Sequence, residues 1–158
     1  MKDSGVESLE EIPEHWEVSK IRYISKINPV KSESKYTKNS TEIACFLPME
    51  AVSEECVIDT SNKKPIKKIW EGFTYFAKND VVMAKITPCF ENGKGAVLDK
   101  LDTDIGFGTT EFHVLRASKK VNSYFLFYIL RTSRFKKLGE ENMVGTAGQK
   151  KSSDRVFI

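Results

Sequence analysis

The chain has 158 residues, of which 40% are hydrophobic and 30% are charged, and its net charge is +3. This composition excludes a wholly disordered protein, and no apolar run approaches the roughly 20 residues that a transmembrane helix needs. Three scattered cysteines and two histidines exclude a disulfide framework and argue against a zinc site, so we expect buried or half-buried free thiols. The sequence therefore predicts a single cytoplasmic domain with no cofactor, no bound metal and no membrane contact.

The charge is unevenly distributed along the chain. Residues 1–17 contain one lysine and six acidic residues, whereas residues 117–158 contain nine Lys or Arg and three acidic residues. A basic C-terminal quarter suits a polyanion such as nucleic acid, although a run of charges is more often simply a solvated surface.

The first half of the chain predicts one helix and several short strands. After an extended segment that reaches Trp16, apolar residues recur at every third position from Glu17 to Ile27. This spacing indicates an amphipathic helix that ends near Asn28 and Pro29. Apolar residues 43–47 predict a strand, and further short strands are expected at residues 56–59 and 68–76, separated by a basic loop at residues 61–65.

The segment from Asp80 to Arg116 is expected to form the centre of the sheet. Residues 80–86 are typical of a buried strand, residues 96–98 of another small strand, and residues 109–116 alternate between an apolar and a polar face. Residues 87–95 form a polar loop whose glycines permit tight turns and close approach by another molecule. A rigid sheet that displays such a loop is a common way to build a recognition site.

A second helix is expected near the C-terminus. Asn122 or Ser123 can cap it, and its apolar residues continue to about Leu138, where Gly139 would end it. The sequence thus predicts one α/β (α+β) domain over residues 1–158. It would contain a twisted mixed or antiparallel sheet, an N-terminal amphipathic helix, a long helix near the C-terminus, and flexible ends at about residues 1–11 and 143–158.

Two glycine-containing segments resemble sites of enzymes but lack parts that such sites require. Residues 145–151 differ from a nucleotide-hydrolase phosphate loop because Gln149 interrupts the Gly-Lys pair, so they could hold one phosphate of a polymer or form an unstructured basic loop. Residues 104–108 are interpreted as a β-turn, since a strand rather than a helix follows them. No nuclease carboxylate motif is present, and His113 is more typical of a sheet residue than of a general base. The chain is therefore not predicted to be an enzyme.

Five segments, in order along nearly the whole chain, carry a resemblance to a known family. They are Ser4-Gly-Val-Glu7 with Glu11-Ile-Pro-Glu-His-Trp-Glu-Val18, Phe46-Leu-Pro-Met-Glu-Ala-Val52, Asp80-Val-Val-Met-Ala-Lys-Ile-Thr-Pro-Cys-Phe-Glu-Asn-Gly-Lys94, Gly106-Phe-Gly-Thr-Thr-Glu-Phe-His-Val-Leu115 and Met143-Val-Gly-Thr-Ala-Gly-Gln-Lys150. Together they resemble the N-terminal target recognition domain of the DNA-specificity (S) subunit of type I restriction–modification systems. Ser8 and Glu10 depart from the pattern, because relatives commonly carry Trp and Gly there. The second recognition domain and the long spacer helices of the family are absent, so we expect an isolated domain, either an excised fragment or the product of a truncated gene.

The resemblance implies sequence-specific binding of double-stranded DNA. Such a domain reads one half of a bipartite target and thereby directs methylation and cleavage by the methyltransferase (M) and restriction (R) subunits of the intact complex. Without the long helix, we expect M to be bound weakly. An alternative from another class is a protein-interaction domain that binds M subunits without independent DNA recognition.

The candidate DNA-binding residues are polar or basic side chains of the central loop, the strand after it and two basic loops. Asn can pair with adenine, Lys can donate to guanine and Glu can accept from cytosine, although some of these residues could instead hold the loop in shape. The basic loops would supply phosphate contacts. The predicted set is Lys63, Lys64, Lys85, Thr87, Glu91, Asn92, Lys94, Thr110, Thr146, Gln149, Lys150 and Lys151.

Overall fold

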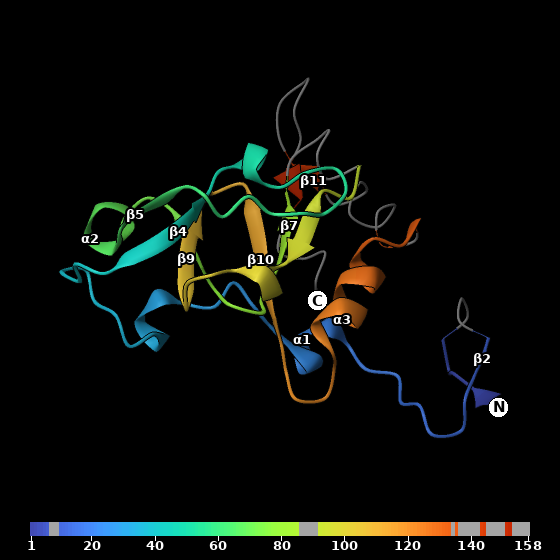
Figure 1. Cartoon of the computed structure of the whole chain (residues 1–158). Helices are drawn as coiled ribbons and strands as arrows, with labels where there is room; N and C mark the ends of the chain where they lie inside the picture. Colours follow the sequence, from blue (N-terminus) through green and yellow to red (C-terminus); the bar gives the residue numbers. More distant parts are fainter. Residues whose placement is uncertain (7–9, 86–91, 134, 136–142, 145–150, 153–158) are drawn as a thin grey trace.

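Two four-stranded sheets pack face to face in the computed structural model, which describes residues 1–6, 10–85, 92–133, 135, 143–144 and 151–152 (Figure 1). The first sheet has the strand order β3-β10-β7-β8 and is antiparallel throughout. Its strands are β3 (Ser25–Ile27), β10 (Phe112–Ala117), β7 (Val81–Ala84) and β8 (Gly95–Val97).

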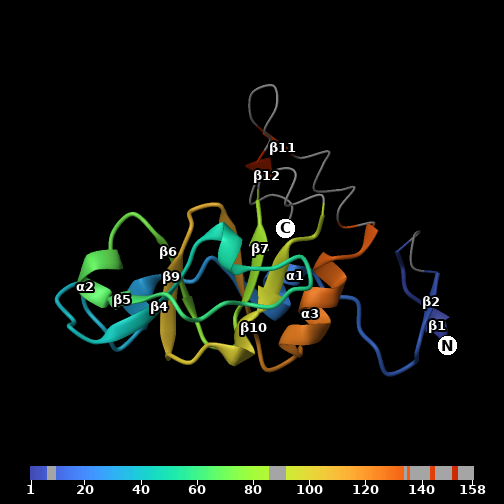
Figure 2. The same ribbon diagram turned by 45° about the horizontal axis from the view of Figure 1, so that its top comes forward.

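The second sheet is mixed and has the strand order β5-β4-β9-β6. Its strands are β5 (Lys63–Pro65), β4 (Ile43–Leu47), β9 (Ile105–Gly108) and β6 (Thr74–Ala77). The central strands β4 and β9 pair in parallel, whereas β5 and β6 pair with them in antiparallel fashion. Figure 2 shows the two sheets from a second direction, with β4, β9 and β6 of the second sheet to the left of β7 and β10 of the first.

Apolar side chains fill three layers around the sheets. The central layer joins residues of both sheets, among them Leu47, Phe76 and Val114. Helix α3 (Ser123–Leu130) covers the outer face of the first sheet, and helix α2 (Ile66–Ile69) covers that of the second. Because β7 is covered on both faces, all four of its residues are buried, which explains its continuous apolar sequence.

Several short elements complete the chain. They are α1 (Ile21–Ile24), the 3₁₀ helices η1 (Lys31–Glu33), η2 (Met49–Ala51) and η3 (Leu98–Lys100), the strand pair β1 (Lys2–Asp3) and β2 (Glu11–Ile12), and the strand pair β11 (Met143–Val144) and β12 (Lys151–Ser152). None of the helices in the described part of the chain is long and apolar enough to cross a membrane.

The α/β (α+β) class, the single domain and the strand at residues 43–47 are confirmed, but both predicted helices are shorter than expected. The N-terminal helix is reduced to α1, because residues 25–27 pair with β10 instead. The predicted C-terminal helix begins after Asn122, whose Oδ1 accepts a hydrogen bond from the Tyr124 amide at 2.8 Å. It ends at Leu130, although residues 133 and 135 are again helical.

Four other predictions of local structure were wrong. No strand forms at residues 56–59, where Ile58 makes only an isolated bridge to Val52. The strand expected at residues 68–76 is divided between α2 and β6, and the basic loop at residues 61–65 contains β5. The turn expected at residues 104–108 is strand β9, which lies in the middle of the second sheet. For β5 and β9, pairing with neighbouring strands outweighs the local preference of the residues. The structure does not test the expected domain limits or the flexibility of the chain ends.

Candidate nucleic-acid interface

The ends of several strands and the loops next to them lie together at one end of the two sheets. β7 ends where β10 begins, since Ala84 pairs with Phe112, and β8 begins beside the same end of β7, since Met83 pairs with Gly95. β4 and β9 end at the same side, because Leu47 pairs with Gly108 and only residues 109–111 separate β9 from β10. We call this region the loop end and define it as residues 48–50, 73–74, 85, 92–94 and 109–111.

Backbone hydrogen bonds hold the loop end together. The Ala84 amide donates to the Lys94 carbonyl at 2.9 Å, and the Lys85 amide donates to the Glu111 carbonyl at 2.8 Å. The Thr109 amide donates to the Leu47 carbonyl at 3.1 Å, which extends the pairing of β4 and β9 in the second sheet to this end. The polar segments are therefore presented on a rigid base, as a recognition surface requires.

Four predicted DNA-binding residues lie at the loop end, namely Lys85, Asn92, Lys94 and Thr110. Asn92 and Thr110 are exposed, and Lys94 is half-buried. Asn92 is followed by Gly93, whose φ of 66° lies in the left-handed region that favours glycine. Asn92 and Lys94 precede β8 and Thr110 precedes β10, and these two strands lie on opposite sides of β7. The side chains offer amide, hydroxyl and ammonium groups, which are the kinds of group that contact base edges.

The other predicted site residues have different positions. Lys63 and Lys64 lie on β5, an edge strand of the second sheet, whereas Asn92 and Lys94 directly precede β8 of the first sheet. The structure therefore does not bring these two groups together on one sheet. Thr87, Glu91, Thr146, Gln149 and Lys150 lie outside the described residues, and Lys151 is part of β12.

The two lysines of β5 already have partners in the folded chain. Lys63 Nζ lies 2.7 Å from a carboxylate oxygen of Asp102, and this hydrogen bond raises the pKa of Lys63. Lys64 Nζ lies 4.5 Å from the ring centroid of Phe46. A phosphate that contacted Lys63 would have to compete with Asp102.

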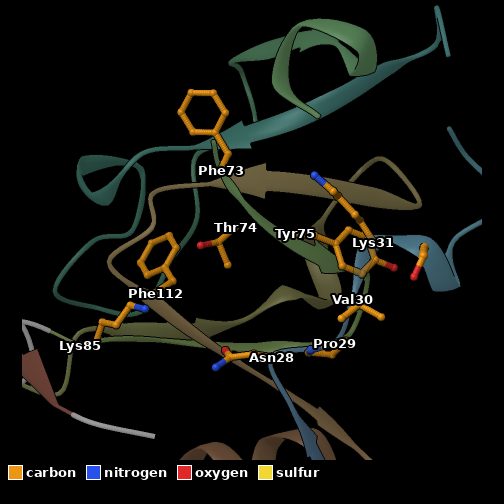
Figure 3. A pocket seen from close by; sticks show the side chains of 10 residues that line it. Asn28, Pro29, Val30, Lys31, Phe73, Thr74, Tyr75, Lys85 and Phe112 are labelled. Atoms are coloured by element: carbon orange, nitrogen blue, oxygen red, sulfur yellow. The ribbon is translucent and has the colours of Figure 1, made fainter. Parts of the chain in front are cut away.

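A pocket of about 440 Å³ lies beside the loop end, between the chain after β3 and strands β6 and β10 (Figure 3). The rings of Phe112 and Tyr75 lie on opposite sides of it, with Thr74 between them, and Lys85 points into it from the end of β7. Asn28 and Lys31 line the side formed by the chain after β3. Apart from Lys85, none of these residues was predicted from the sequence, because they come from separate segments and share no motif.

Charged groups fix the wall of the pocket. Lys31 Nζ donates to the Trp70 carbonyl and lies 3.1 Å from a carboxylate oxygen of Glu71. Behind Tyr75, the guanidinium of Arg116 lies 5.8 Å from the ring centroid and is hydrogen-bonded to Asp80, which raises the pKa of Arg116. Charge pairs of opposite sign therefore hold two parts of the pocket wall in place, Lys31 with Glu71 at the chain after β3 and Arg116 with Asp80 behind Tyr75.

Neither catalytic nor metal chemistry is indicated by the described residues. His113 is buried within β10, where it pairs with Met83, which agrees with its interpretation as a sheet residue. Within the ranges that the structure describes, no three His, Cys, Asp or Glu side chains are grouped so as to hold a metal ion. Cys45 is buried and Cys56 is half-buried, as expected, and both are free thiols.

Comparisons with known proteins point to one family. The chain is 40% identical over 145 residues to the type I restriction enzyme EcoAI specificity subunit of Escherichia coli, which covers 89% of this chain and 24% of the relative. It is 37% identical over 151 residues to the EcoEI specificity subunit of the same organism, with 93% of this chain and 24% of the relative covered. The chain thus spans about a quarter of the length of these curated relatives. No family model matches the chain.

Solved structures support the fold. A crystal structure of the HsdS subunit from Thermoanaerobacter tengcongensis matches with a TM-score of 0.70 and 18% identity, over 96% of this chain and 38% of that one. A chain from a structural study of complex assembly and conformational transition in the type I R-M system matches with a TM-score of 0.62 and 18% identity, over 76% of this chain and 31% of that one. At this level of identity, the likeness establishes the fold.

Proposed function

The chain is homologous to the specificity subunits of type I restriction enzymes and corresponds to one part of such a subunit, and we propose that this part is a target recognition domain that binds double-stranded DNA sequence-specifically. It reads one half of a bipartite target and directs methylation and cleavage by the M and R subunits of an intact complex. The observation that carries the proposal is the 40% identity over 145 residues to a protein whose name describes specificity in a restriction enzyme.

The loop end supplies groups suited to this role. Asn92 and Thr110 are exposed, and both side chains can exchange hydrogen bonds with base edges in the major groove. Lys94 adds a cation that attracts the DNA backbone or donates to guanine. Thr87 and Glu91 belong to the same chain connection and remain candidates. Lys150 and Lys151 are proposed as phosphate contacts, which position the domain without reading sequence.

The chain contributes recognition and no catalytic step of its own. The relatives are specificity subunits, and bond-making is assigned to the other subunits of the restriction enzyme. This division explains a surface that combines polar side chains with a rigid sheet, because sequence reading depends on hydrogen-bond geometry and needs neither a nucleophile nor a metal.

The direct test is selection of bound duplexes from a random DNA pool at low salt, where electrostatic attraction strengthens binding. We expect one short sequence to be enriched and to bind more tightly than a scrambled duplex of the same composition. Equal binding of the enriched and scrambled duplexes at every salt concentration would contradict sequence-specific recognition.

A second candidate function rests on helix α3. Its outer face carries Tyr124, Phe125 and Tyr128, whose exposed fractions are 43%, 47% and 62%. Exposed aromatic residues are enriched in protein–protein interfaces. A protein-interaction domain that captures M subunits would explain them, and retention of M without measurable affinity for any duplex would favour this alternative over DNA recognition.

A further inference from the structure

Lysines are concentrated at the β5 edge of the second sheet, and the alternation of strand side chains divides them between its two faces. Lys63 lies opposite Cys45, whose side chain belongs to the central apolar layer between the sheets. Lys64 lies opposite Ala44, whose side chain belongs to the layer beneath α2. Of these two lysines, only Lys64 therefore shares the outer face of the sheet with helix α2.

Helix α2 holds two more cations on this outer face. Its first and last residues, Ile66 and Ile69, are only 1% and 2% exposed and pack into the apolar layer beneath the helix. Lys67 and Lys68 lie between these two anchors, and both are exposed. The Lys67 amide also donates to the Ser40 carbonyl at 3.1 Å. The backbone that carries the two ammonium groups is therefore fixed at several points.

The charge of this group is not balanced by acidic side chains within the described part of the chain. We call the group the β5–α2 lysines, and its members are Lys64, Lys67 and Lys68. Among the described residues, none of the three forms an ion pair. The neighbouring Glu71 is paired with Lys31, and Glu42 contacts α2 through its carbonyl, which accepts from the Ile66 amide, while its side chain is exposed. Three uncompensated cations on a fixed backbone attract a polyanion.

Two ring contacts connect the β5–α2 lysines to the loop end. Lys64 Nζ lies 4.5 Å from the ring centroid of Phe46. That centroid lies 4.8 Å from the ring centroid of Phe73, which belongs to the loop end. A strand rises about 3.3 Å per residue, so β4 extends about 10 Å from Phe46 back to Ile43, which pairs with Pro65 directly before α2. This length matches about three successive phosphates of one DNA strand.

A second pair of exposed lysines lies at a different place in the molecule. Lys119 and Lys120 are in the turn after β10, and this turn follows Ala117, at the opposite end of β10 from Phe112 and the loop end. Figure 1 shows the turn at the bottom of the view, whereas α2 and β5 lie at the left. These two lysines of the basic C-terminal quarter therefore lie away from the loop end.

We propose that DNA bound at the loop end continues across the outer face of the second sheet, with phosphates of one strand against the β5–α2 lysines. The inference rests on the proposed function, because it assigns the path that the duplex follows from the loop end. Ammonium groups that neutralise phosphates release counterions, which strengthens binding to every sequence alike. The β5–α2 lysines thus orient the domain on the duplex while the loop end reads bases, and the duplex does not reach Lys119 and Lys120.

The first test measures how affinity depends on salt. The double variant Lys67→Gln/Lys68→Gln is compared with the matched control Lys119→Gln/Lys120→Gln, and each removes two exposed positive charges from the 158-residue chain. Affinities for the enriched and the scrambled duplex are measured at several salt concentrations. Because each ammonium group neutralises one phosphate, the slope of log affinity against log salt should become shallower by about 1.8 in the first variant. The control should keep its slope, and the affinity ratio of the two duplexes should stay constant in both variants.

The second test locates the contact directly. Reductive methylation of the unchanged protein, with and without the enriched duplex, is read at each lysine by mass spectrometry. We expect the duplex to protect Lys67 and Lys68 and to leave Lys119 and Lys120 as reactive as in the free protein.

Three results would overturn the inference: an unchanged slope in Lys67→Gln/Lys68→Gln, equal changes of slope in both double variants, or equal protection of the two lysine pairs. The proposed function is tested separately by the ratio of affinities for the enriched and scrambled duplexes. A high ratio with an unchanged slope would refute the path of the duplex alone, and a shallower slope without a high ratio would refute sequence-specific reading alone.

Discussion

Arg116 and Asp80 form a two-point ion pair across the first sheet. Arg116 Nε donates to Asp80 Oδ1 at 2.8 Å, and Arg116 Nη2 donates to Asp80 Oδ2 at 2.9 Å. The Asp80 side chain is only 2% exposed, and its Oδ2 also accepts a hydrogen bond from the Ala77 amide at 2.8 Å. The pair therefore ties β10 to the turn between β6 and β7, behind the pocket wall.

Replacing Arg116 should destabilise the protein strongly. Arg116→Gln leaves the buried carboxylate of Asp80 without its cation, and loss of one partner of a fully buried pair costs about 3–5 kcal/mol. Because the Arg116 side chain is itself 29% exposed, we expect a loss of about 2–3 kcal/mol in the free energy of unfolding. Urea denaturation measures it. Lys35→Ala is the control, since solvent screens the exposed Lys35–Asp104 pair and its loss should barely change the free energy of unfolding. Similar losses in the two variants would show that the buried pair has no special role.

Gly108 should not tolerate a side chain. An ideal Cβ at this position would lie 2.4 Å from the Leu47 carbonyl oxygen, which is backbone and accepts a hydrogen bond from the Thr109 amide. Gly108→Ala must therefore separate β4 from β9, and we expect a loss near the upper end of the range of about 1–3 kcal/mol for overpacking. In Gly72→Ala nothing lies within 4 Å, so only backbone strain of about 1 kcal/mol is expected from its φ of 82°. Thermal or urea unfolding of both variants measures the difference, and a smaller loss for Gly108→Ala would contradict the close approach.

Stability should fall at alkaline pH in a way that depends on Cys45. Burial raises the pKa of the Cys45 thiol from 9.0 to about 11. Between these values the unfolded chain loses this proton while the folded chain retains it, so the stabilisation is complete below pH about 9 and is lost as the pH approaches about 11. The free energy of unfolding of Cys45→Ala, measured over this interval, should decline less steeply than that of the unchanged protein. Parallel curves would contradict the shift.

Asn92→Ala tests direct reading of a base. If Asn92 pairs with a base edge, its loss should cost about 1–3 kcal/mol on the enriched duplex and relax the preference at one position. Binding to scrambled duplexes should be nearly unchanged, because that binding depends on phosphate contacts. Fluorescence anisotropy with single-base variants of the enriched duplex measures both effects. Equal losses on enriched and scrambled DNA would remove Asn92 from the base-reading residues.

The parts of the fold that could be predicted are those in which local sequence and tertiary burial agree. Residues 43–47 and 81–84 are continuous apolar runs, so burial on both faces of a strand follows from the sequence itself. Strand β9 was missed because its glycines indicate a turn in isolation. In the structure they are needed for close contact, since a Cβ at Gly106 would lie 2.3 Å from the Phe76 ring. The sequence does not reveal this requirement until the partner strand is known.

Only the site residues that lie in polar segments next to recognisable strands could be predicted from the sequence. Asn92, Lys94 and Thr110 belong to polar segments that flank recognisable strands, and the structure brings them to one end of the molecule. The pocket depends on Tyr75 and Phe112, which read simply as apolar strand residues, and on Lys31, which lies in a short 3₁₀ helix. Only the pairing of distant strands brings these residues together, and no local pattern encodes that pairing.

The chain between β7 and β8 joins two strands that are neighbours in the same antiparallel sheet. Neither strand depends on the connection for its pairing, because Val81, Val82 and Met83 are matched to β8 by their own backbone hydrogen bonds. The length and composition of this connection can therefore diverge between lineages while the scaffold is inherited unchanged. Under the proposed function, exchange of residues 85–94 alone would change the groups offered to DNA while the paired strands on either side stay in place.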